Sequence, residues 1–237
     1  MNTPPALPDA DHLPEGDEKA AAVRAMFDTI APRYDLVNRI MTFRLDVAWR
    51  RRAIGALDLG SRAIVLDLAC GTGDMCRDLT DAGLRPVGVD LSFGMLAASR
   101  TDAPLVHGDG LVLPFPDDSI DGVTCGFALR NFVALEPLFA ELARILRPGG
   151  RISLLDVAEP PNAFLKWGHS VYFGKVVPLI GGLLSNRDAY RYLPKSVAYL
   201  PEPSVLRQQI VDAGFIDVER RLLTHGISQL YTGTRVG

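Results

Sequence analysis

The order of apolar segments along this chain of 237 residues constrains its fold more than any other feature. Short, branched, apolar runs alternate with stretches whose apolar residues recur every three or four positions, which indicates strands alternating with helices. Such alternation is typical of a parallel sheet with helices on both faces. The strands are expected at residues 63–69, 85–90, 104–109, 119–129 and 151–159.

The end of the chain departs from this alternation. Residues 216–223 and 227–235 are two strand-like runs separated by Thr224, His225 and Gly226, which predicts a hairpin. This layout differs from the usual dinucleotide-binding one and resembles the class I S-adenosylmethionine-dependent methyltransferase (Rossmann-like) fold. We therefore expect an α/β protein with a seven-stranded sheet, an antiparallel terminal hairpin and an N-terminal helical cap.

A single domain is expected after a short tail. Residues 1–18 are rich in proline and acidic side chains, which predicts a disordered tail. Residues 19–237 are expected to form one methyltransferase domain, in which residues 19–57 have helical spacing and make a cap over the cofactor site.

Composition narrows the class of protein. The net charge of −3 gives no general electrostatic basis for binding nucleic acid. Cys70, Cys76 and Cys125 lack the spacing of zinc ligands or of a disulfide framework, so we expect reduced cysteines and no metal. The N-terminus lacks the charged and apolar regions of a secretory signal, and no run reaches the ~20 apolar residues of a membrane span. A cytoplasmic protein is expected.

The first strand is followed by a glycine-rich turn that predicts a nucleotide-type cofactor. Asp67 stands at the strand end, and Gly71, Thr72 and Gly73 lead into a helix, where two glycines allow close backbone approach. The spacing resembles the S-adenosylmethionine motif, in which the acid holds the amino group of the methionyl moiety. As a dinucleotide motif it is deficient, because Cys76 stands at the third glycine position.

The next two strand ends carry further polar candidates. Asp90, followed by Leu91, lies about twenty residues on, where an acid accepts ribose hydroxyls. In methyltransferases an acid and an adjacent amide after the third strand meet the adenine, and Asp109 and Gly110 occupy that place here. Each acid alone also fits a helix cap or a solvated turn. Their recurrence at successive strand ends favours S-adenosyl-L-methionine as the cofactor.

Three segments resemble the ubiquinone/menaquinone biosynthesis C-methyltransferase family (demethylmenaquinone methyltransferase-like). They are residues 34–49, 144–156 and 188–193, and the resemblance runs from about Val23 to the C-terminus. The fourth strand end reads GFALRN, without the Asn/Asp-Pro-Pro-aromatic motif of nucleic-acid amino-methyltransferases. The chain departs from the family pattern at Val37, Thr42, Asp46, Asp156 and Ala158, of which Asp46, in place of a histidine, is the largest chemical change.

The resemblance implies C-methylation of a polyprenylated quinol ring, with demethylmenaquinol as the preferred acceptor. Arg130 would stabilise the phenolate or polarise a water, and Asn131 would orient the ring oxygen. The alternative for Arg130 is an ion pair with Asp35 or Asp74. Tyr34 and Asp35 complete the catalytic candidates, and the candidate quinol pocket comprises Asn38, Phe127, Tyr190 and Tyr192.

Other acceptors and partners stay open on the sequence alone. A ubiquinone-pathway benzoquinol, another phenolic or lipid small molecule, a non-catalytic cofactor-binding subunit and an NAD-dependent oxidoreductase are the competing interpretations. A polyprenyl quinol is the expected partner and nucleic acid is not. Residues 162–184, with Trp167 and Tyr172 between lysines, suggest a peripheral contact with the inner face of the cell membrane or else a core-facing helix. A homodimer is also considered.

Overall fold

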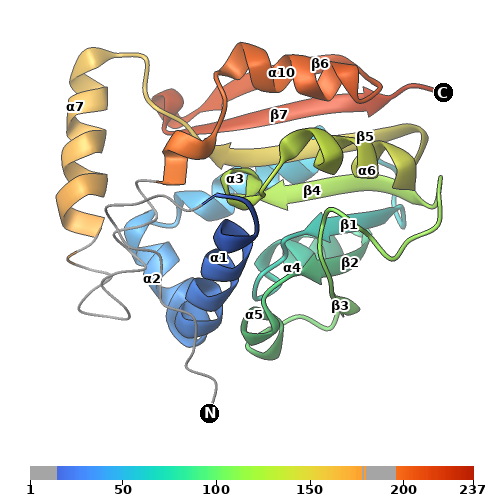
Figure 1. The fold of residues 1–237 in the computed structure, drawn as a ribbon, viewed down its shortest axis with the longest axis horizontal. Helices are drawn as coiled ribbons and strands as arrows, with labels where there is room; N and C mark the ends of the chain where they lie inside the picture. Colours follow the sequence, from blue (N-terminus) through green and yellow to red (C-terminus); the bar gives the residue numbers. More distant parts are fainter. Residues whose placement is uncertain (1–14, 178, 180–195) are drawn as a thin grey trace.

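The computed structural model describes residues 15–177, 179 and 196–237, and its centre is one mixed β-sheet (Figure 1). The seven strands lie in the order β3-β2-β1-β4-β5-β7-β6. Strands β1 to β5 pair in parallel, and β7 pairs antiparallel with both β5 and β6. The expected sheet with its terminal hairpin is thus confirmed. The strands are β1 (Ile64–Leu68), β2 (Arg85–Asp90), β3 (Leu105–His107), β4 (Ile120–Gly126), β5 (Leu146–Val157), β6 (Phe215–Leu223) and β7 (Ser228–Arg235).

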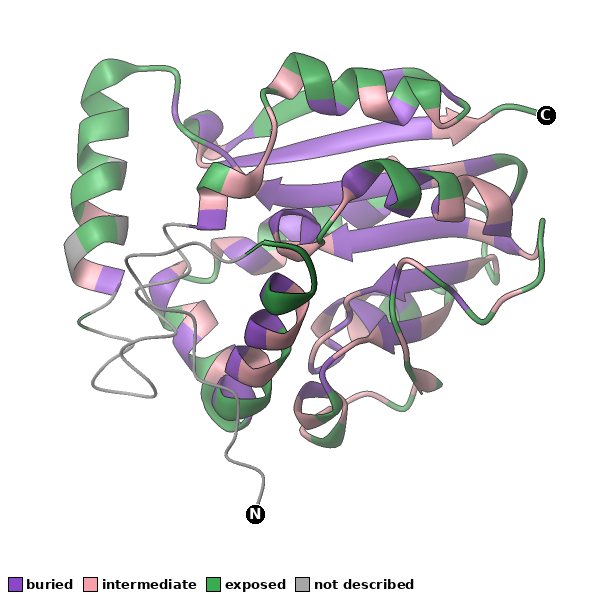
Figure 2. Cartoon of the chain, viewed as in Figure 1, coloured by how far each residue is buried: buried purple, intermediate pink, exposed green. Residues whose placement is uncertain are grey.

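Helices cover both faces of this sheet. One face packs against α6 and α10, and the other against α3 and α4. In Figure 2 the strands are largely buried between these layers. The helices are α1 (Gly16–Ile30), α2 (Tyr34–Met41), α3 (Leu45–Ala56), α4 (Asp74–Asp81), α5 (Phe93–Ala97), α6 (Leu135–Ile145), α7 (Ala163–Val171) and α10 (Pro203–Asp212). Short turns of helix are η1 (Ala31–Arg33), η2 (Leu129–Asn131), η3 (Tyr172–Val176), η4 (Ser196–Tyr199) and η5 (Thr224–Gly226).

Strand β1 is an apolar run because both of its faces are buried. Leu66 and Leu68 pack into the core shared with α6, whereas Val65 packs into the core shared with α3. Side chains alternate between the faces of a strand, so a strand covered on both faces has to be apolar at successive positions. Asp67 is the polar exception, and its place at the strand end gives it a different role.

The fourth strand is shorter than expected. It ends at Gly126, not at residue 129, because Phe127 adopts φ +61° and the chain turns into η2. The guanidinium of Arg130 donates a 2.8 Å hydrogen bond to the carbonyl of Phe127 across this turn. The sequence GFALRN therefore forms a strand end followed by a tight turn, which brings its last residues back toward the sheet.

Two N-terminal helices lie across the carboxyl ends of the parallel strands. Helix α1 begins at Gly16, not at residue 19, and residues 1–14 lie outside the described part of the chain. Asp28 of α1 accepts hydrogen bonds from the Ser92 hydroxyl (2.6 Å) and the Gly94 amide (2.8 Å) at the start of α5. Lys19 donates a 2.7 Å bond to the Phe132 carbonyl after η2. These hydrogen bonds attach helix α1 to the start of α5 and to the segment after η2. Helix α3 instead packs on one face of the sheet.

Candidate active site

A cavity lies where β1, β2 and β4 end beneath α1 and α2, which is the expected place in an open parallel sheet. Counted with its open mouth, it has a volume of about 1250 Å³. The cavity opens to solvent at its mouth, so a small molecule can reach the strand ends from outside.

The turn after β1 forms the floor of this cavity. Gly71 and Gly73 have φ of +56° and +82°, which L side chains rarely adopt. A Cβ on Gly73 would also collide with the side chain of Thr101. Gly71 and Thr72 line the cavity, whereas Gly73 supports the turn from beneath as the residue before α4.

Asp67 is a carboxylate almost without solvent contact in the wall of the cavity. It accepts hydrogen bonds from Thr124 Oγ1 (3.1 Å) and Cys76 Sγ (3.3 Å). Burial raises the pKa of Asp67 to about 7, although these two bonds oppose the rise. A buried acid of this kind is stabilised in its charged form by a cationic ligand, which fits the amino group of a bound methionyl moiety.

Asp90 holds the edge of the cavity at the end of β2. Its two carboxylate oxygens accept from the Gly71 amide (2.7 Å) and the Ser92 amide (2.8 Å). Burial raises the pKa of Asp90, and the two amide bonds counteract this. The carboxylate oxygens keep lone pairs for hydroxyl donors, which is what a ribose supplies. Leu91 lines the cavity beside it.

Asp109 and Gly110 line the cavity beyond β3. Asp109 is exposed and accepts a 2.9 Å bond from the Leu111 amide, which closes the turn. A Cβ on Gly110 would lie 2.8 Å from a ring carbon of Phe132, so the glycine lets this ring stand against the cavity. At the predicted adenine end, Gly110 and the Phe132 ring thus pack directly against each other and form one part of the cavity wall.

Helix α2 brings three predicted residues to the opposite wall, namely Tyr34, Asp35 and Asn38. Asp35 is buried and accepts a 2.5 Å bond from the Thr72 hydroxyl, which ties α2 to the glycine turn. Burial raises the pKa of Tyr34 to about 12, and the charge of Arg130 partly offsets this rise. Tyr34 therefore stays a protonated phenol at neutral pH and is able to donate a hydrogen bond.

The expectation that Arg130 pairs with Asp35 or Asp74 is wrong. Arg130 is buried and forms an ion pair with Asp156, whose side chain is 1% exposed. Its Nε also donates to the Ser196 hydroxyl at 3.0 Å, and the guanidinium is not part of the cavity wall. The pairing follows from the turn after Gly126, which folds Arg130 back over the end of β5. Asp74 instead meets Arg39, Arg50 and Arg77.

Asn131 and Phe127 remain at the cavity next to Arg130. Asn131 Oδ1 is buried and has no hydrogen-bond partner in the described structure. Buried polar atoms are nearly always paired, so this unpaired amide oxygen is an unusual feature of a residue that lines the cavity. Tyr190 and Tyr192 lie outside the described residues, as does the whole segment 188–193.

Asp46, the main departure from the family pattern, does not line the cavity. It is fully buried in the first turn of α3, where it accepts from Thr42 Oγ1 (2.6 Å) and Arg50 Nη1 (2.7 Å). Arg50 in turn donates to Asp78 at 2.6 Å. The position therefore builds an ion-pair network beside the site and makes no contact with the cavity itself.

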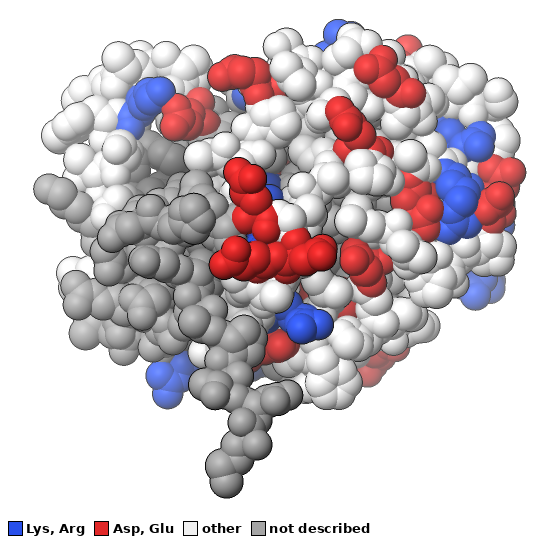
Figure 3. Space-filling model, viewed as in Figure 1, with Lys and Arg blue, Asp and Glu red and all other residues white. Residues whose placement is uncertain are grey.

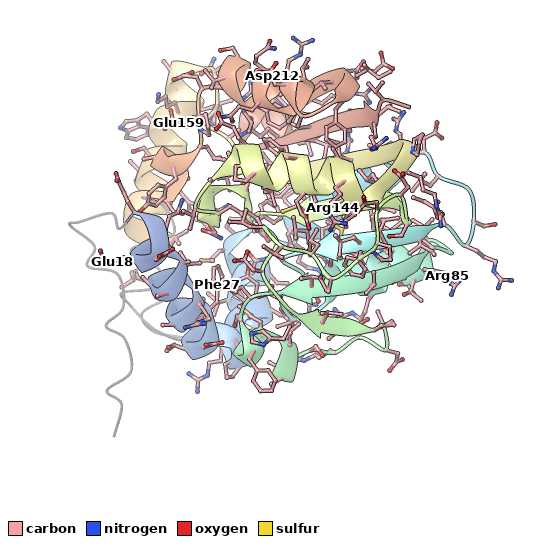
Figure 4. The ribbon with its side chains drawn as sticks, turned by 45° about the vertical axis from the view of Figure 1, so that its right-hand side comes forward. Glu18, Phe27, Arg85, Arg144, Glu159 and Asp212 are labelled. Atoms are coloured by element: carbon pink, nitrogen blue, oxygen red, sulfur yellow. The ribbon has the colours of Figure 1, made fainter. Side chains whose placement is uncertain are left out.

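Sequence reasoning predicted a helical cap over the cofactor site but did not name the cap residues that line the cavity. Helix α1 supplies Val23, Arg24 and Phe27, and α3 supplies Arg50. Phe27 lies on the side of α1 that faces the sheet, whereas Glu18 points away (Figure 4). The available signal was the apolar spacing of α1, which indicates a buried face without saying what that face covers.

Comparison with known proteins agrees with this geometry. The model of the ubiE/COQ5 methyltransferase family matches residues 15–235. The chain belongs to this family. A demethylmenaquinone methyltransferase of Thermus thermophilus is 43% identical over 221 residues, which cover 89% of this chain and 100% of the relative. A ubiquinone/menaquinone biosynthesis C-methyltransferase UbiE of Geobacter sulfurreducens is 38% identical over 230 residues, or 92% and 90% of the two chains.

Solved structures share the fold of this family member at low sequence identity. A Haemonchus contortus phosphoethanolamine N-methyltransferase 2 superposes with a TM-score of 0.65 at 15% identity, covering 90% of this chain and 60% of that one. The [4+2]-cyclase SpnF gives 0.65 at 14% identity, covering 95% and 99%. A cyclase and an N-methyltransferase on one fold show that the fold does not determine the reaction.

Family membership establishes the enzyme class. The chain is an S-adenosylmethionine-dependent methyltransferase, as the strand-end acids and the glycine turn predicted. None of the helices in residues 15–177 and 196–237 is long and apolar enough to cross a bilayer.

Proposed function

We propose that this methyltransferase transfers a methyl group to a ring carbon of demethylmenaquinol and so forms menaquinol. One cavity lined both by the strand-end acids Asp67 and Asp90 and by Tyr34 and Asp35 of α2 carries the proposal. The relatives support it, since the Thermus thermophilus protein is a demethylmenaquinone methyltransferase.

The residues present fit S-adenosylmethionine. Asp67 would hold the amino group, Asp90 the ribose hydroxyls, and the cavity wall at Asp109 and Gly110 the adenine. When bound, the cofactor would supply an electrophilic methyl group on a sulfonium, with the thioether as the leaving group. Positioning of ring and methyl in line is the largest contribution the protein can make to this step.

The acceptor would lie on the α2 side, against residues that contact a ring oxygen. Asn131 and Tyr34 both line the cavity there, and Tyr34 stays protonated because its pKa is raised to about 12. Donors aimed at a phenolic oxygen stabilise the negative charge that makes the ortho carbon nucleophilic. Arg130 adds positive potential from behind the wall, because it lowers the pKa of Tyr34 without lining the cavity.

The ring carbon has to lose a proton after the methyl group is attached. Asp35 is the carboxylate of α2 on the cavity wall, and we propose it as the acceptor, either directly or through a water. The Thr72 hydroxyl fixes one of its oxygens at 2.5 Å, so the carboxylate is held in one orientation. Asn38 and Phe127 would shape the ring pocket from α2 and from the turn after β4.

Methyl transfer from labelled S-adenosylmethionine tests the proposal. Demethylmenaquinol and the demethylated benzoquinol would be offered separately under reducing conditions. We expect label in the naphthoquinol, and a loss of at least 100-fold in kcat for Asn131→Leu with cofactor affinity retained. Gln209→Met is the matched control, because Gln209 Oε1 is also buried and unpartnered but lies away from the cavity.

The outcomes separate the acceptors. Label only in the benzoquinol would assign the enzyme to the ubiquinone pathway. No label in either quinol, despite cofactor binding, would refute quinol methylation and point to another phenolic or lipid acceptor. Equal losses in Asn131→Leu and Gln209→Met would refute the role of Asn131.

A further inference from the structure

Helix α7 exposes apolar side chains on the outside of the molecule. Phe164 and Trp167 are 76% and 65% exposed, and Leu165 and Val171 are exposed as well. All residues from 163 to 168 are exposed, so the first two turns of this helix have almost no cover from the rest of the protein. Figure 2 shows α7 standing away from the sheet and exposed along its length.

A helix in this setting needs a partner. Isolated helices of about 12–15 residues are marginal in water, and α7 together with η3 spans residues 163–176. Its start is well capped, since Asn162 Oδ1 accepts from the amides of Phe164 (3.0 Å) and Leu165 (3.2 Å). A cap sets where the helix begins but does not bury its apolar residues.

Helix α2 presents a second apolar stripe. Leu36 and Ile40 stand at i and i+4 on one face of α2 and are 56% and 41% exposed, and Phe43, in the turn that follows α2, is 73% exposed. The opposite face of α2 buries Val37 and Met41 in a core cluster with α1. The exposed stripe is therefore a separate face of α2 and not a poorly packed core.

The two stripes meet at η3, which follows α7 directly. The Tyr172 hydroxyl donates a 2.8 Å bond to the carbonyl of Met41, and the rings of Tyr172 and Phe43 are 5.8 Å apart. We name the combined apolar face the α2–α7 surface. It consists of Leu36, Ile40, Phe43, Phe164, Leu165, Trp167 and Val171.

Cations accompany this surface. Arg33, Arg39 and Arg44 flank the apolar residues of α2. Arg39 also pairs with Asp74 at 3.4 Å, and the acid of that stretch, Asp35, is buried toward the cavity. Helix α7 carries Lys166, which forms an exposed ion pair with Glu159 at 2.6 Å. The surface of α7 is otherwise largely uncharged (Figure 3). The sign is opposite to that of the whole chain, whose net charge is −3.

We propose that the α2–α7 surface docks the enzyme on an anionic lipid bilayer. Apolar side chains with an interfacial tryptophan and nearby cations are what a helix lying in the headgroup region needs, and each cation near an anionic surface adds ~1 kcal/mol. A second copy of this chain fits less well, because a two-fold contact sets the same cations against each other. The inference rests on the proposed function, in which the acceptor carries a lipid tail.

Docking by this surface places the cavity wall that α2 forms next to the lipid. Tyr34 and Asn38 line the cavity from the same helix whose other face carries Leu36 and Ile40. A prenylated ring therefore has to travel about one helix width, roughly 10 Å, between headgroup region and cavity. Its tail can stay in the bilayer while the ring reacts.

Co-sedimentation of the full chain with vesicles tests the docking. We compare pure phosphatidylcholine with a 70:30 mixture of phosphatidylcholine and phosphatidylglycerol. Binding is expected to the mixture, to be at least tenfold weaker in Phe164→Ser/Trp167→Ser, and to weaken with salt. Ile216→Ser/Leu222→Ser is the matched control, since Ile216 and Leu222 are 51% and 43% exposed on β6.

Tryptophan fluorescence gives an independent readout. The chain has two tryptophans, and Trp49 of α3 is buried, so a blue shift on adding vesicles reports Trp167. Methyl transfer to an acceptor without a prenyl tail, in vesicle-free buffer, is expected to be equal in wild type and the α7 variant. Failure of that transfer in wild type would overturn the proposed function, whatever the vesicles show.

Three results would overturn the docking proposal itself. The first is no binding to either vesicle. The second is binding that the α7 variant and the β6 control reduce equally. The third is a wild-type protein that does not bind vesicles but forms a concentration-dependent dimer in sedimentation equilibrium, which the α7 variant abolishes. That result would make this surface a contact between two copies of the chain.

Discussion

The buried ion pair of Arg130 and Asp156 allows a quantitative test of what Arg130 does. The two side chains are 8% and 1% exposed, and Arg130 also donates to the Ser196 hydroxyl and the Phe127 carbonyl. In Arg130→Ala, Asp156 would be left as a buried carboxylate without its cation. The turn that presents Phe127 and Asn131 would also lose the bond that closes it.

The size of the effect follows from this burial. Removing one partner of a buried ion pair costs about 3–5 kcal/mol, because the remaining charge is uncompensated. For a domain of this length each kcal/mol lowers the melting temperature by about 2–4 °C. We therefore expect Arg130→Ala to melt about 6–20 °C below the wild type. In Arg130→Leu/Asp156→Leu neither charge is left behind, and much of the loss should be recovered.

Thermal unfolding with a parallel activity assay separates structure from chemistry. Arg147→Ala is the control, because Arg147 pairs with Asp121 at the surface, where its side chain is 45% exposed and such a pair contributes about 0–1 kcal/mol. If the positioning role is correct, the double variant regains stability while methyl transfer stays low, since the turn at Phe127 remains open. A melting temperature for Arg130→Ala within 2 °C of the wild type, with activity abolished, would refute this reasoning and return Arg130 to direct contact with the reacting ring.

Three further predictions concern the cofactor site and the α1 fastening. A cationic ligand needs ionised Asp67, whose pKa is about 7. Affinity for S-adenosylhomocysteine, measured by calorimetry, should therefore rise up to tenfold per pH unit below pH 7 and level off above it. Asp67→Asn should bind weakly at every pH, without this slope. Gly110→Ala should weaken cofactor binding by about 1–3 kcal/mol through its clash with Phe132, whereas Gly108→Ala, whose Cβ has ordinary contacts, should bind normally in the same titration. Burial lowers the pKa of Lys19 from 10.5 to about 8, so between these pH values the unfolded chain binds a proton that the folded chain does not. The free energy of unfolding of the wild type should therefore rise from pH 8 to pH 10 relative to Lys19→Met, as measured by urea unfolding.

The strand-end acids illustrate how far sequence reasoning reaches. Asp67, Asp90 and Asp109 were placed at one edge of a sheet because parallel strands end on the same side. The structure brings all three to one cavity. The argument succeeds because strand direction follows from local alternation of elements, which the sequence carries directly.

Arg130 illustrates the limit of sequence reasoning. The sequence analysis placed Arg130 at the end of a strand running to residue 129, with its guanidinium at the reacting ring, and gave an ion pair with Asp35 or Asp74 as the alternative. The positive φ of Phe127 ends the strand earlier and redirects Arg130 to Asp156, 26 residues away. A backbone turn of this kind is set by contacts distant in sequence, which a local pattern does not contain.

The sequence by itself determined the order of elements, the antiparallel hairpin, the cofactor class and the family, because these depend on periodicity and on short motifs. The tertiary structure decided which side chains meet. It placed Asp46 in a buried network with Arg50, selected Val23, Arg24 and Phe27 as the α1 residues that line the cavity, and left apolar side chains of α2 and α7 exposed. Periodicity says that a helix has an apolar face. Only packing decides whether that face meets the core or remains at the surface, because burial depends on what the rest of the chain leaves uncovered.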